Sequence, residues 1–331
     1  MTLRRAVVAL IAVLSLLLAG CSGSASSSKS SASSSGGASS GSFPQTVDTA
    51  FGKVTINQAP KRVVALGWGD AETALALGVQ PVGASDWLNF GGEGVGPWAK
   101  GLYTTAPTII ATMEPSYEQI ASLKPDLILD VKSSGDQDRY NRLSQIATTV
   151  GIPQGGASYL ANMDQQVTMI ATALGQPAKG KELLDGVDAS YKKVAEAHPQ
   201  WKDKTVTVAT RTSQGWGAYV EGDTRLSALE KLGFKQNPTI ASMTPGSSGF
   251  SVSVSSEQLS SFNADLIVAF PIYIDTTQIT DDAQWKQLST VQAGHDVVID
   301  GDLSSAFSIG STLAVNYMLD NMTPKLEKAV S

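Results

Sequence analysis

The segment 176–198 constrains the fold most, because it reads as one long helix with a marked start and stop. Pro177 stands where the first turn of a helix accepts proline, and Pro199 follows the end of the pattern. Apolar residues recur between the two prolines at three- and four-residue spacing, on one helical face: Leu184, Val187, Tyr191 and Val194. We interpret this helix as a stiff connection between two bodies.

Two similar pieces of sequence lie on either side of this helix. Residues 118–128 read EQIASLKPDLI, and residues 257–267 read EQLSSFNADLI. Six of their residue types coincide at one constant offset of 139 positions (257 − 118). We therefore predict two α/β lobes of the same build, at 43–175 and 199–331, joined by one long rigid helix. A chain of 331 residues has room for two such lobes, since single cores commonly need roughly 100–150 residues.

Short apolar runs alternate with helical patterns in the first lobe, as is typical of βαβ units. Strands at 62–66 and 81–85 flank an expected helix at 71–77, for which Asp70 is a candidate N-cap. Another helix is expected at 136–149. The second lobe also reads as α/β, although its strands do not clearly follow a strictly parallel order.

The first 42 residues read as an export signal followed by a tether. Residues 1–20 carry a short basic start and an apolar run too short to span a bilayer, which is typical of a signal peptide. Cys21, the one cysteine of the chain, follows small residues directly and looks like the lipobox cysteine of bacterial lipoproteins. The alternative is an ordinary cleavage site beside a coincidental cysteine. The rest of 21–42 is a Ser/Gly-rich linker that cannot bury apolar surface, and the Arg4-Arg5 pair leaves the export route, Sec or Tat, open.

From residue 43 to the C-terminus the chain resembles the helical-backbone class (class III) of periplasmic binding proteins, the substrate receptors of iron–siderophore ABC importers. Beside the lipobox, three motifs carry the resemblance: PKRVVAL at 60–66, LGVQPVG at 77–83 and YEQIASLKPDLI at 117–128. The stretch 68–98 and the turn 211–213 look like those of actinobacterial members. The resemblance implies a cleft between two lobes and little hinge motion, because one helix bridges them.

The resemblance also implies two partners. In this family one surface glutamate from each lobe docks onto arginines of the membrane permease, and Glu118 and Glu257 fall on those positions, with Glu114 as a nearby competitor. Two equivalent acidic groups suit a two-fold symmetric partner, but first-turn glutamates stabilised by a helix dipole are the alternative reading. A lipid on Cys21, such as the diacylglycerol and palmitate of lipoproteins, would hold the protein on the extracytoplasmic face of the cell membrane.

A receptor for a ferric siderophore needs no cofactor or metal ligands of its own, because the ligand brings its iron already wrapped in oxygen donors. It needs an aromatic concave wall and a few basic groups. We therefore expect a ferric siderophore, of the hydroxamate type, to contact side chains from loops that follow strands. The candidates are Trp68, Trp87, Trp98, Arg139, Arg211, Trp216, Tyr219, Arg225, Phe250, Tyr273 and Phe307. Trp216 and Tyr219 have a strong alternative reading as core residues, since a given aromatic side chain is more often buried.

Composition and missing motifs argue against other classes of protein. The formal net charge of −6 disfavours nucleic acid as a partner. Two histidines and one cysteine are too few for a typical metal site, so a receptor for bare metal ions is disfavoured. The sequence has no G-x-S-x-G elbow, H-E-x-x-H motif or P-loop, and we expect no enzyme and no catalytic residues. The same fold carrying cobalamin or haem remains the main alternative, and we expect a monomer.

Overall fold

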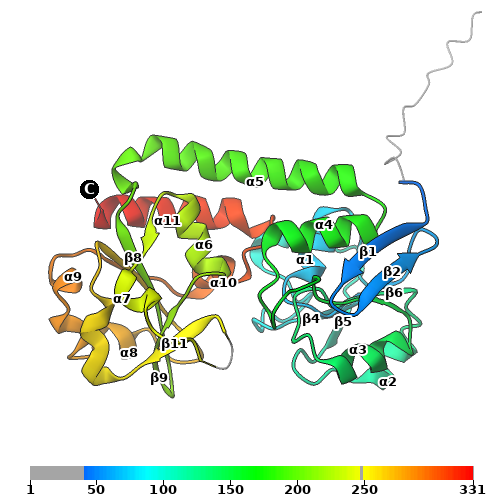
Figure 1. Cartoon of the computed structure of the whole chain (residues 1–331), viewed down its shortest axis with the longest axis horizontal. Coiled ribbons are helices and arrows are strands. Elements are labelled where there is room, and N and C mark those ends of the chain that lie inside the picture. Colours follow the sequence, from blue (N-terminus) through cyan, green and yellow to red (C-terminus); the bar gives the residue numbers. More distant parts are fainter. Residues whose placement is uncertain (1–40, 247–248, 331) are drawn as a thin grey trace, which may run out of the picture. The chain divides into compact units, whose positions relative to one another are not determined.

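The computed structural model describes residues 41–246 and 249–330 (Figure 1). The predicted signal peptide, Cys21 and nearly all of the Ser/Gly-rich linker lie outside these residues. The described chain begins with a hairpin in which β1 (Gln45–Thr49) pairs antiparallel with β2 (Gly52–Ile56). The hairpin lies against the first of two larger sheets, which define the two predicted lobes.

The first lobe is built on a parallel sheet of order β5-β4-β3-β6-β7. Its central strands read Val-Val-Ala, Gly-Ala-Ser and Leu-Ile-Leu and are buried throughout, as expected for a parallel sheet covered on both faces. The strands are β3 (Val63–Ala65), β4 (Gly83–Ser85), β5 (Thr108–Ile110), β6 (Leu127–Leu129) and β7 (Thr148–Val150). The helices are α1 (Asp70–Ala76), the 3-10 turn η1 (Pro97–Ala99), α2 (Tyr117–Ser122), α3 (Gln137–Ser144) and α4 (Met163–Ala173).

The second lobe has a mixed sheet of order β11-β9-β8-β12-β13, with β10 also paired to β8. β8 pairs parallel with β12 and antiparallel with β9. This mixed pairing explains why the sequence of the second lobe did not indicate a strictly parallel order. The strands are β8 (Thr205–Thr212), β9 (Gly215–Tyr219), β10 (Lys235–Gln236), β11 (Ser251–Val254), β12 (Leu266–Pro271) and β13 (Asp296–Val298). The α-helices are α6 (Thr224–Lys231), α7 (Pro238–Ala241), α8 (Thr277–Thr280), α9 (Ser289–Gln292), α10 (Gly301–Ile309) and α11 (Ala314–Ala329). The 3-10 turns are η2 (Pro199–Trp201), η3 (Ser256–Phe262) and η4 (Trp285–Gln287).

One helix, α5 (Pro177–Ala197), connects the two lobes and confirms the helix predicted at 176–198 (Figure 1). Its side chains belong to both cores. Leu183 packs against the hydrophobic core of the first lobe, whereas Val187 and Tyr191 are buried in the core of the second. Because one continuous helix is anchored on both sides, the fold is two α/β lobes on a rigid connection, as predicted.

Two local predictions were wrong. Asp70 does not cap α1, because Gly69 occupies the N-cap with a positive φ of 79° and Asp70 is already helical. Its carboxylate instead accepts a hydrogen bond from the backbone N–H of Val131, in the loop that follows β6, the strand beside β3 in the sheet. The helix expected at 136–149 ends at Ser144, and Thr148–Val150 is the edge strand β7. The Thr-Thr-Val sequence of this segment favours a strand when a sheet edge is available.

Candidate ligand-binding site

A cavity of about 800 Å³ lies between the two lobes, and we call it the interlobe cavity. Its walls come from the segments that follow parallel strands of both sheets, where ligands of open α/β sheets are expected. The first lobe supplies Trp68 after β3, residues 86–89 after β4 and residues 109–113 at the end of β5. The second lobe supplies 270–273 at the end of β12, with Arg225, Ser304, Ser305 and Ser308 from helices α6 and α10.

The wall of the first lobe is a stack of aromatic rings. The ring centroids of Trp68 and Trp87 lie 4.3 Å apart with an interplanar angle of 7°, and Tyr159 lies 4.1 Å from Trp68. Such close, nearly parallel rings hold one another in place and present a flat apolar surface. Trp68 and Trp87 follow strands β3 and β4, and both line the interlobe cavity.

Tyr273 reaches toward this wall from the opposite lobe. Its side chain is exposed (80%), and its hydroxyl oxygen lies 3.5 Å from the backbone oxygen of Trp87. Its backbone has a φ of 55°, a left-handed conformation that is unusual for a residue with a large side chain. Tyr273 therefore stands between the two lobes and lines the interlobe cavity.

Arg225 lines the cavity as part of a buried ion pair. Its Nη2 and Nε atoms donate to the carboxylate of Asp223 over 2.5 and 2.8 Å, and its guanidinium carbon lies 3.7 Å from the ring centre of Tyr219. Burial disfavours the charged guanidinium, but the Asp223 carboxylate outweighs this effect and raises the pKa of Arg225. The cation is therefore fixed in position by its own lobe.

A smaller inner cavity adjoins the first and shares Trp68, Trp87 and Arg225 with it. Here Lys132 of the first lobe donates a hydrogen bond from Nζ to Oγ1 of Thr224 in the second lobe, over 2.8 Å. Burial lowers the pKa of Lys132 to about 8, although the nearby Asp223 carboxylate opposes that shift. This hydrogen bond connects the two lobes at the inner cavity.

Two buried carboxylates on α1 hold the loops of the site. Asp70 accepts hydrogen bonds from the Val131 N–H (2.8 Å) and from Nε2 of Gln166 (2.6 Å), and burial raises its pKa to about 6. Glu72 accepts from Nε1 of Trp98 (2.8 Å) and from the hydroxyl of Ser311, which belongs to the second lobe. Burial also raises the pKa of Glu72. A second interlobe hydrogen bond therefore starts from the first turn of α1.

Several predicted ligand-binding residues lie away from the interlobe cavity wall. Trp98 is bonded to Glu72 and packs on Tyr317, and Arg139 is held by Asp130 at 2.7 Å and lines a different hollow. Four others lie in or against the core of the second lobe. Trp216 stacks on Trp285, and Arg211 lies over the Trp216 ring. Tyr219 lies between Phe250 and Phe270, and Phe307 packs against Phe270. Phe250 lines the small inner cavity.

Sequence reasoning missed several residues that line the two cavities. Those at the ends of strands or directly after them could have been found by the rule that selected Trp87, namely Asp86, Leu88, Asn89, the 109–113 segment and the 270–272 segment. Tyr159 and the three serines of α10 carry no comparable signal, because only the tertiary fold brings them to the site. Lys132 does carry it, since it follows β6 at the same distance at which Trp68 follows β3.

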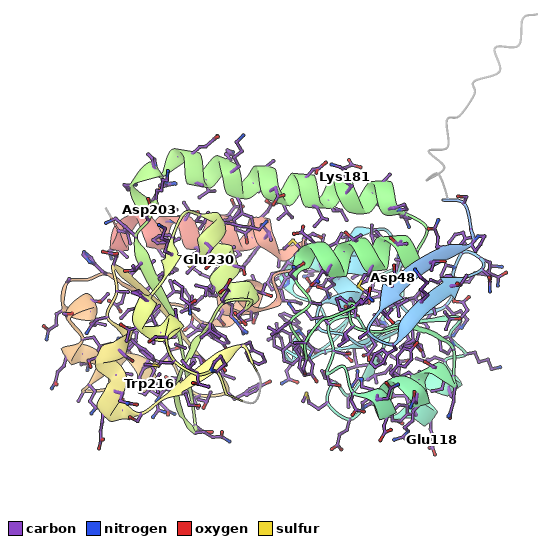
Figure 2. All side chains as sticks on the ribbon, viewed as in Figure 1. Asp48, Glu118, Lys181, Asp203, Trp216 and Glu230 are labelled. Atoms are coloured by element: carbon purple, nitrogen blue, oxygen red, sulfur yellow. The ribbon has the colours of Figure 1, made fainter. Side chains whose placement is uncertain are left out.

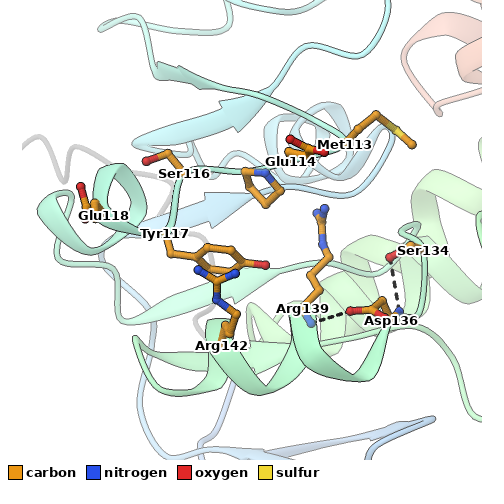
Figure 3. A pocket seen from close by; sticks show the side chains of 10 residues that line it. Met113, Glu114, Ser116, Tyr117, Glu118, Ser134, Asp136, Arg139 and Arg142 are labelled. Carbon is orange, nitrogen blue, oxygen red and sulfur yellow. Dashed lines mark hydrogen bonds between the residues drawn. The ribbon is translucent and has the colours of Figure 1, made fainter.

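The predicted docking glutamates are both exposed on the surface, one in each lobe. Glu118 lies in the first turn of α2 (Figure 2), which the Ser116 hydroxyl caps by accepting from the Gln119 N–H. Glu257 lies in η3. Glu118 also borders a hollow of about 530 Å³, which we call the outer groove (Figure 3). In the outer groove the guanidinium carbon of Arg142 lies 3.6 Å from the ring centre of Tyr117.

The described residues contain no group of three or more His, Cys, Asp or Glu side chains that could hold a metal ion. His198 is one example of a histidine used structurally, since its Nε2 lies 2.7 Å from Glu327 and its ring stacks on Trp201. Among the same residues, no helix is both long and apolar enough to cross a membrane.

Two α/β lobes, one bridging helix and an aromatic cavity between the lobes define a solute-binding protein of the rigid, helical-backbone type. The chain belongs to the periplasmic binding protein family, whose model matches residues 63–303. Among curated relatives, it is 29% identical over 298 residues to the "Probable siderophore-binding lipoprotein YfiY" of Bacillus subtilis, covering 86% of this chain and 88% of the relative.

Solved structures agree with the same fold. A periplasmic solute-binding protein from Mycobacterium smegmatis is 27% identical with a TM-score of 0.76, and the match covers 87% of this chain and 99% of that protein. PiaA from Streptococcus pneumoniae, solved in complex with ferrichrome, is 25% identical with a TM-score of 0.74, covering 86% of this chain and 98% of PiaA.

Proposed function

We propose that this protein is an extracytoplasmic receptor that captures a ferric siderophore in the interlobe cavity and delivers it to a membrane ABC importer. The interlobe cavity supports this most directly: its size and its Trp68–Trp87 wall suit a preformed complex of drug-like dimensions. Such a ligand supplies its own iron coordination, so the receptor needs neither a cofactor nor a catalytic residue. The siderophore-binding relative and the PiaA–ferrichrome complex support the same cargo class.

Titration with ferric siderophores tests this proposal. Trp68 and Trp87 lie on the cavity wall, so a bound ferric complex should quench the intrinsic tryptophan fluorescence in a saturable way. Free tryptophan titrated with the same ferric complexes serves as the control for simple absorption effects. A failure of every ferric complex to quench or to raise the melting temperature would contradict the proposal.

Haem and cobalamin are the alternative cargoes. Tyr273 lines the interlobe cavity and offers a phenol oxygen that could ligate haem iron, so haem is the alternative with a specific observation in its favour. An absorbance titration separates the cases, because axial ligation shifts the haem spectrum whereas a ferric siderophore keeps its own band. A secreted enzyme is the least favoured class, and turnover of generic esters would count for it.

Delivery requires two further contacts. We propose that Glu118 and Glu257 dock onto cations of the permease, one from each lobe, and that a lipid on Cys21 holds the monomeric protein at the extracytoplasmic face of the membrane. Both glutamates are exposed, and the YfiY relative is described as a lipoprotein. Mass spectrometry of the mature N-terminus tests the anchor, and an unmodified Cys21 would exclude it.

A further inference from the structure

The charged side chains around the ligand-binding site are evenly balanced. Among the described residues, the interlobe cavity and the inner cavity are lined by four charged groups, namely Asp86, Lys132, Asp223 and Arg225. Two are acidic and two are basic. A ligand with a strong net charge of either sign would therefore find no excess of opposite charge here.

Asp223 is the counter-ion of Arg225, the cation that lines both cavities. Its Oδ1 accepts from both the backbone N–H (2.9 Å) and Nε (2.8 Å) of Arg225, and its Oδ2 accepts from Nη2 (2.5 Å). The two residues are only 4% and 7% exposed. In such a shielded place the attraction between the two charges is weakly screened, so the pair presents little net charge to the cavity.

The remaining charges do not change this balance in favour of an anion. Lys132 is buried (7% exposed) and already donates to Thr224 Oγ1. The Asp223 carboxylate is also the main opposite charge that acts on the Lys132 ammonium. The Asp86 carboxylate accepts from the backbone N–H groups of Phe90 and Gly91, over 3.0 and 2.8 Å, and has no ion pair among the described residues. An anionic ligand would meet a neutralised arginine and an uncompensated carboxylate.

We propose that Asp223 determines the charge class of the cargo, by neutralising Arg225 so that the interlobe cavity accepts iron complexes without net negative charge and rejects anionic ones. The inference rests on the proposed function of the same site. Three hydroxamates just cancel the charge of Fe(III), whereas citrate and catecholate complexes stay anionic. Transfer of an anion from water into this mostly apolar cavity is costly unless a free cation receives it.

The test compares two ferric complexes on the same protein. The probes are ferrichrome, a neutral tris-hydroxamate, and ferric citrate, an anion, with binding followed by tryptophan fluorescence. For the wild-type protein we expect ferrichrome to bind at least about 100-fold more tightly than ferric citrate. We also expect the ferrichrome affinity to depend little on ionic strength, because no net charge is neutralised on binding. Ferric citrate binding as tight as ferrichrome binding would overturn the inference.

The Asp223→Asn variant tests the residue itself. Asparagine retains the shape of aspartate and is an equally good N-cap for α6, but it removes the counter-charge. We expect the ratio of the two affinities to shift at least about 10-fold toward ferric citrate. In the double variant Asp223→Asn/Arg225→Gln the shift should disappear, since the freed cation is gone. Asp185→Asn, which removes an exposed charge on α5, is the matched control and should leave the ratio unchanged.

The possible results distinguish a failure of the Asp223 proposal from a failure of the proposed function. An unchanged ratio in Asp223→Asn, or an equal shift in Asp185→Asn, would overturn the role of Asp223. If Asp223→Asn does not fold, the wild-type comparison and its salt dependence still decide the charge preference. If no ferric complex of any charge binds, both the proposed function and this inference are wrong. If ferric citrate binds tightly, this inference is wrong but the proposed function stands.

Discussion

At the scale of single residues, the site depends on side chains whose neighbours are fixed by the fold. Trp68 illustrates this, because its ring lies between those of Trp87 and Tyr159 and also faces the interlobe cavity. The same residue therefore packs against its aromatic neighbours and forms part of the cavity wall.

Replacing Trp68 with alanine should lower the affinity for a ferric siderophore at least about 10-fold, because both the flat surface and the support of Trp87 are lost. Isothermal titration or fluorescence from the remaining tryptophans measures the change. Trp68→Phe keeps a ring in place and should retain most of the affinity. Wild-type binding by the alanine variant would show that this wall does not contact the ligand.

Asp70 predicts a pH dependence of stability. Its folded-state pKa is raised from 3.8 to about 6 by burial, so the folded protein binds the proton more tightly than the unfolded chain does. The contribution of Asp70 to stability therefore increases as the pH falls through about 6 toward 4, by up to about 3 kcal/mol. Urea unfolding of the wild type and of Asp70→Asn at several pH values isolates this effect, since other groups cancel in the difference. A pH-independent difference would contradict it.

Comparison of Trp68 with Trp216 shows what residue-level reasoning can predict. Trp68 lines the interlobe cavity because a Gly-Trp-Gly turn after a buried strand leaves its side chain at the strand end, and its contact with a ligand stays a prediction. Trp216 lies inside β9, where the side-chain direction depends on which face of the sheet is covered, and it is core. Partners such as Glu72 and Ser311, 239 positions apart, carry no local signal at all.

At the scale of elements, α5 carries two glycines with opposite roles. Gly180 faces α4, where an added Cβ would lie 2.5 Å from the Cβ of Ala171, while Gly186 has no neighbouring atom within 4 Å of such a position. Gly180 therefore permits the close approach of the two helices, and Gly186 only weakens the helix.

We expect Gly180→Ala to destabilise the protein by about 1–3 kcal/mol, because the two helices must separate to make room for the methyl group. Gly186→Ala is the matched control and should stabilise it by about 0.5–1 kcal/mol through higher helix propensity. Chemical denaturation of both variants measures the two changes. Equal effects of the two substitutions would be inconsistent with close α4–α5 packing at Gly180.

The elements themselves were predicted unevenly. The long helix was predicted within one residue at each end, because two prolines and a sustained apolar period mark it. The helix expected at 136–149 was too long, because hydrogen bonding to β6 extends the sheet by β7 and competes with the helical pattern. Tertiary pairing of this kind cannot be read from local propensity.

At the scale of the whole molecule, the lobes are joined by more than α5. The Lys132–Thr224 and Glu72–Ser311 hydrogen bonds cross between the lobes, and Trp98 packs on Tyr317 of the second lobe. Together they favour a receptor that changes shape little on binding.

Charge reversal of Glu118 and Glu257 together should abolish siderophore-dependent iron uptake by cells that carry only this variant, because each glutamate would repel the cations it is proposed to meet. Purified Glu118→Arg/Glu257→Arg protein should still bind the ferric siderophore, since neither residue lines the interlobe cavity. Reversal of the exposed Lys181, in Lys181→Glu, is the control. Normal uptake by the double variant would rule out these docking points.

The interlobe cavity and the outer groove beside Glu118 share one residue, Met113, whose side chain is 67% exposed. A cargo molecule in the interlobe cavity and a membrane protein at the outer groove would both contact the Met113 thioether. The flexible, unbranched methionine can adjust to both. If the importer docks at Glu118 as proposed, it meets Met113 on the side opposite the cargo, so cargo-dependent movement of this one side chain would report to the importer whether the receptor is loaded.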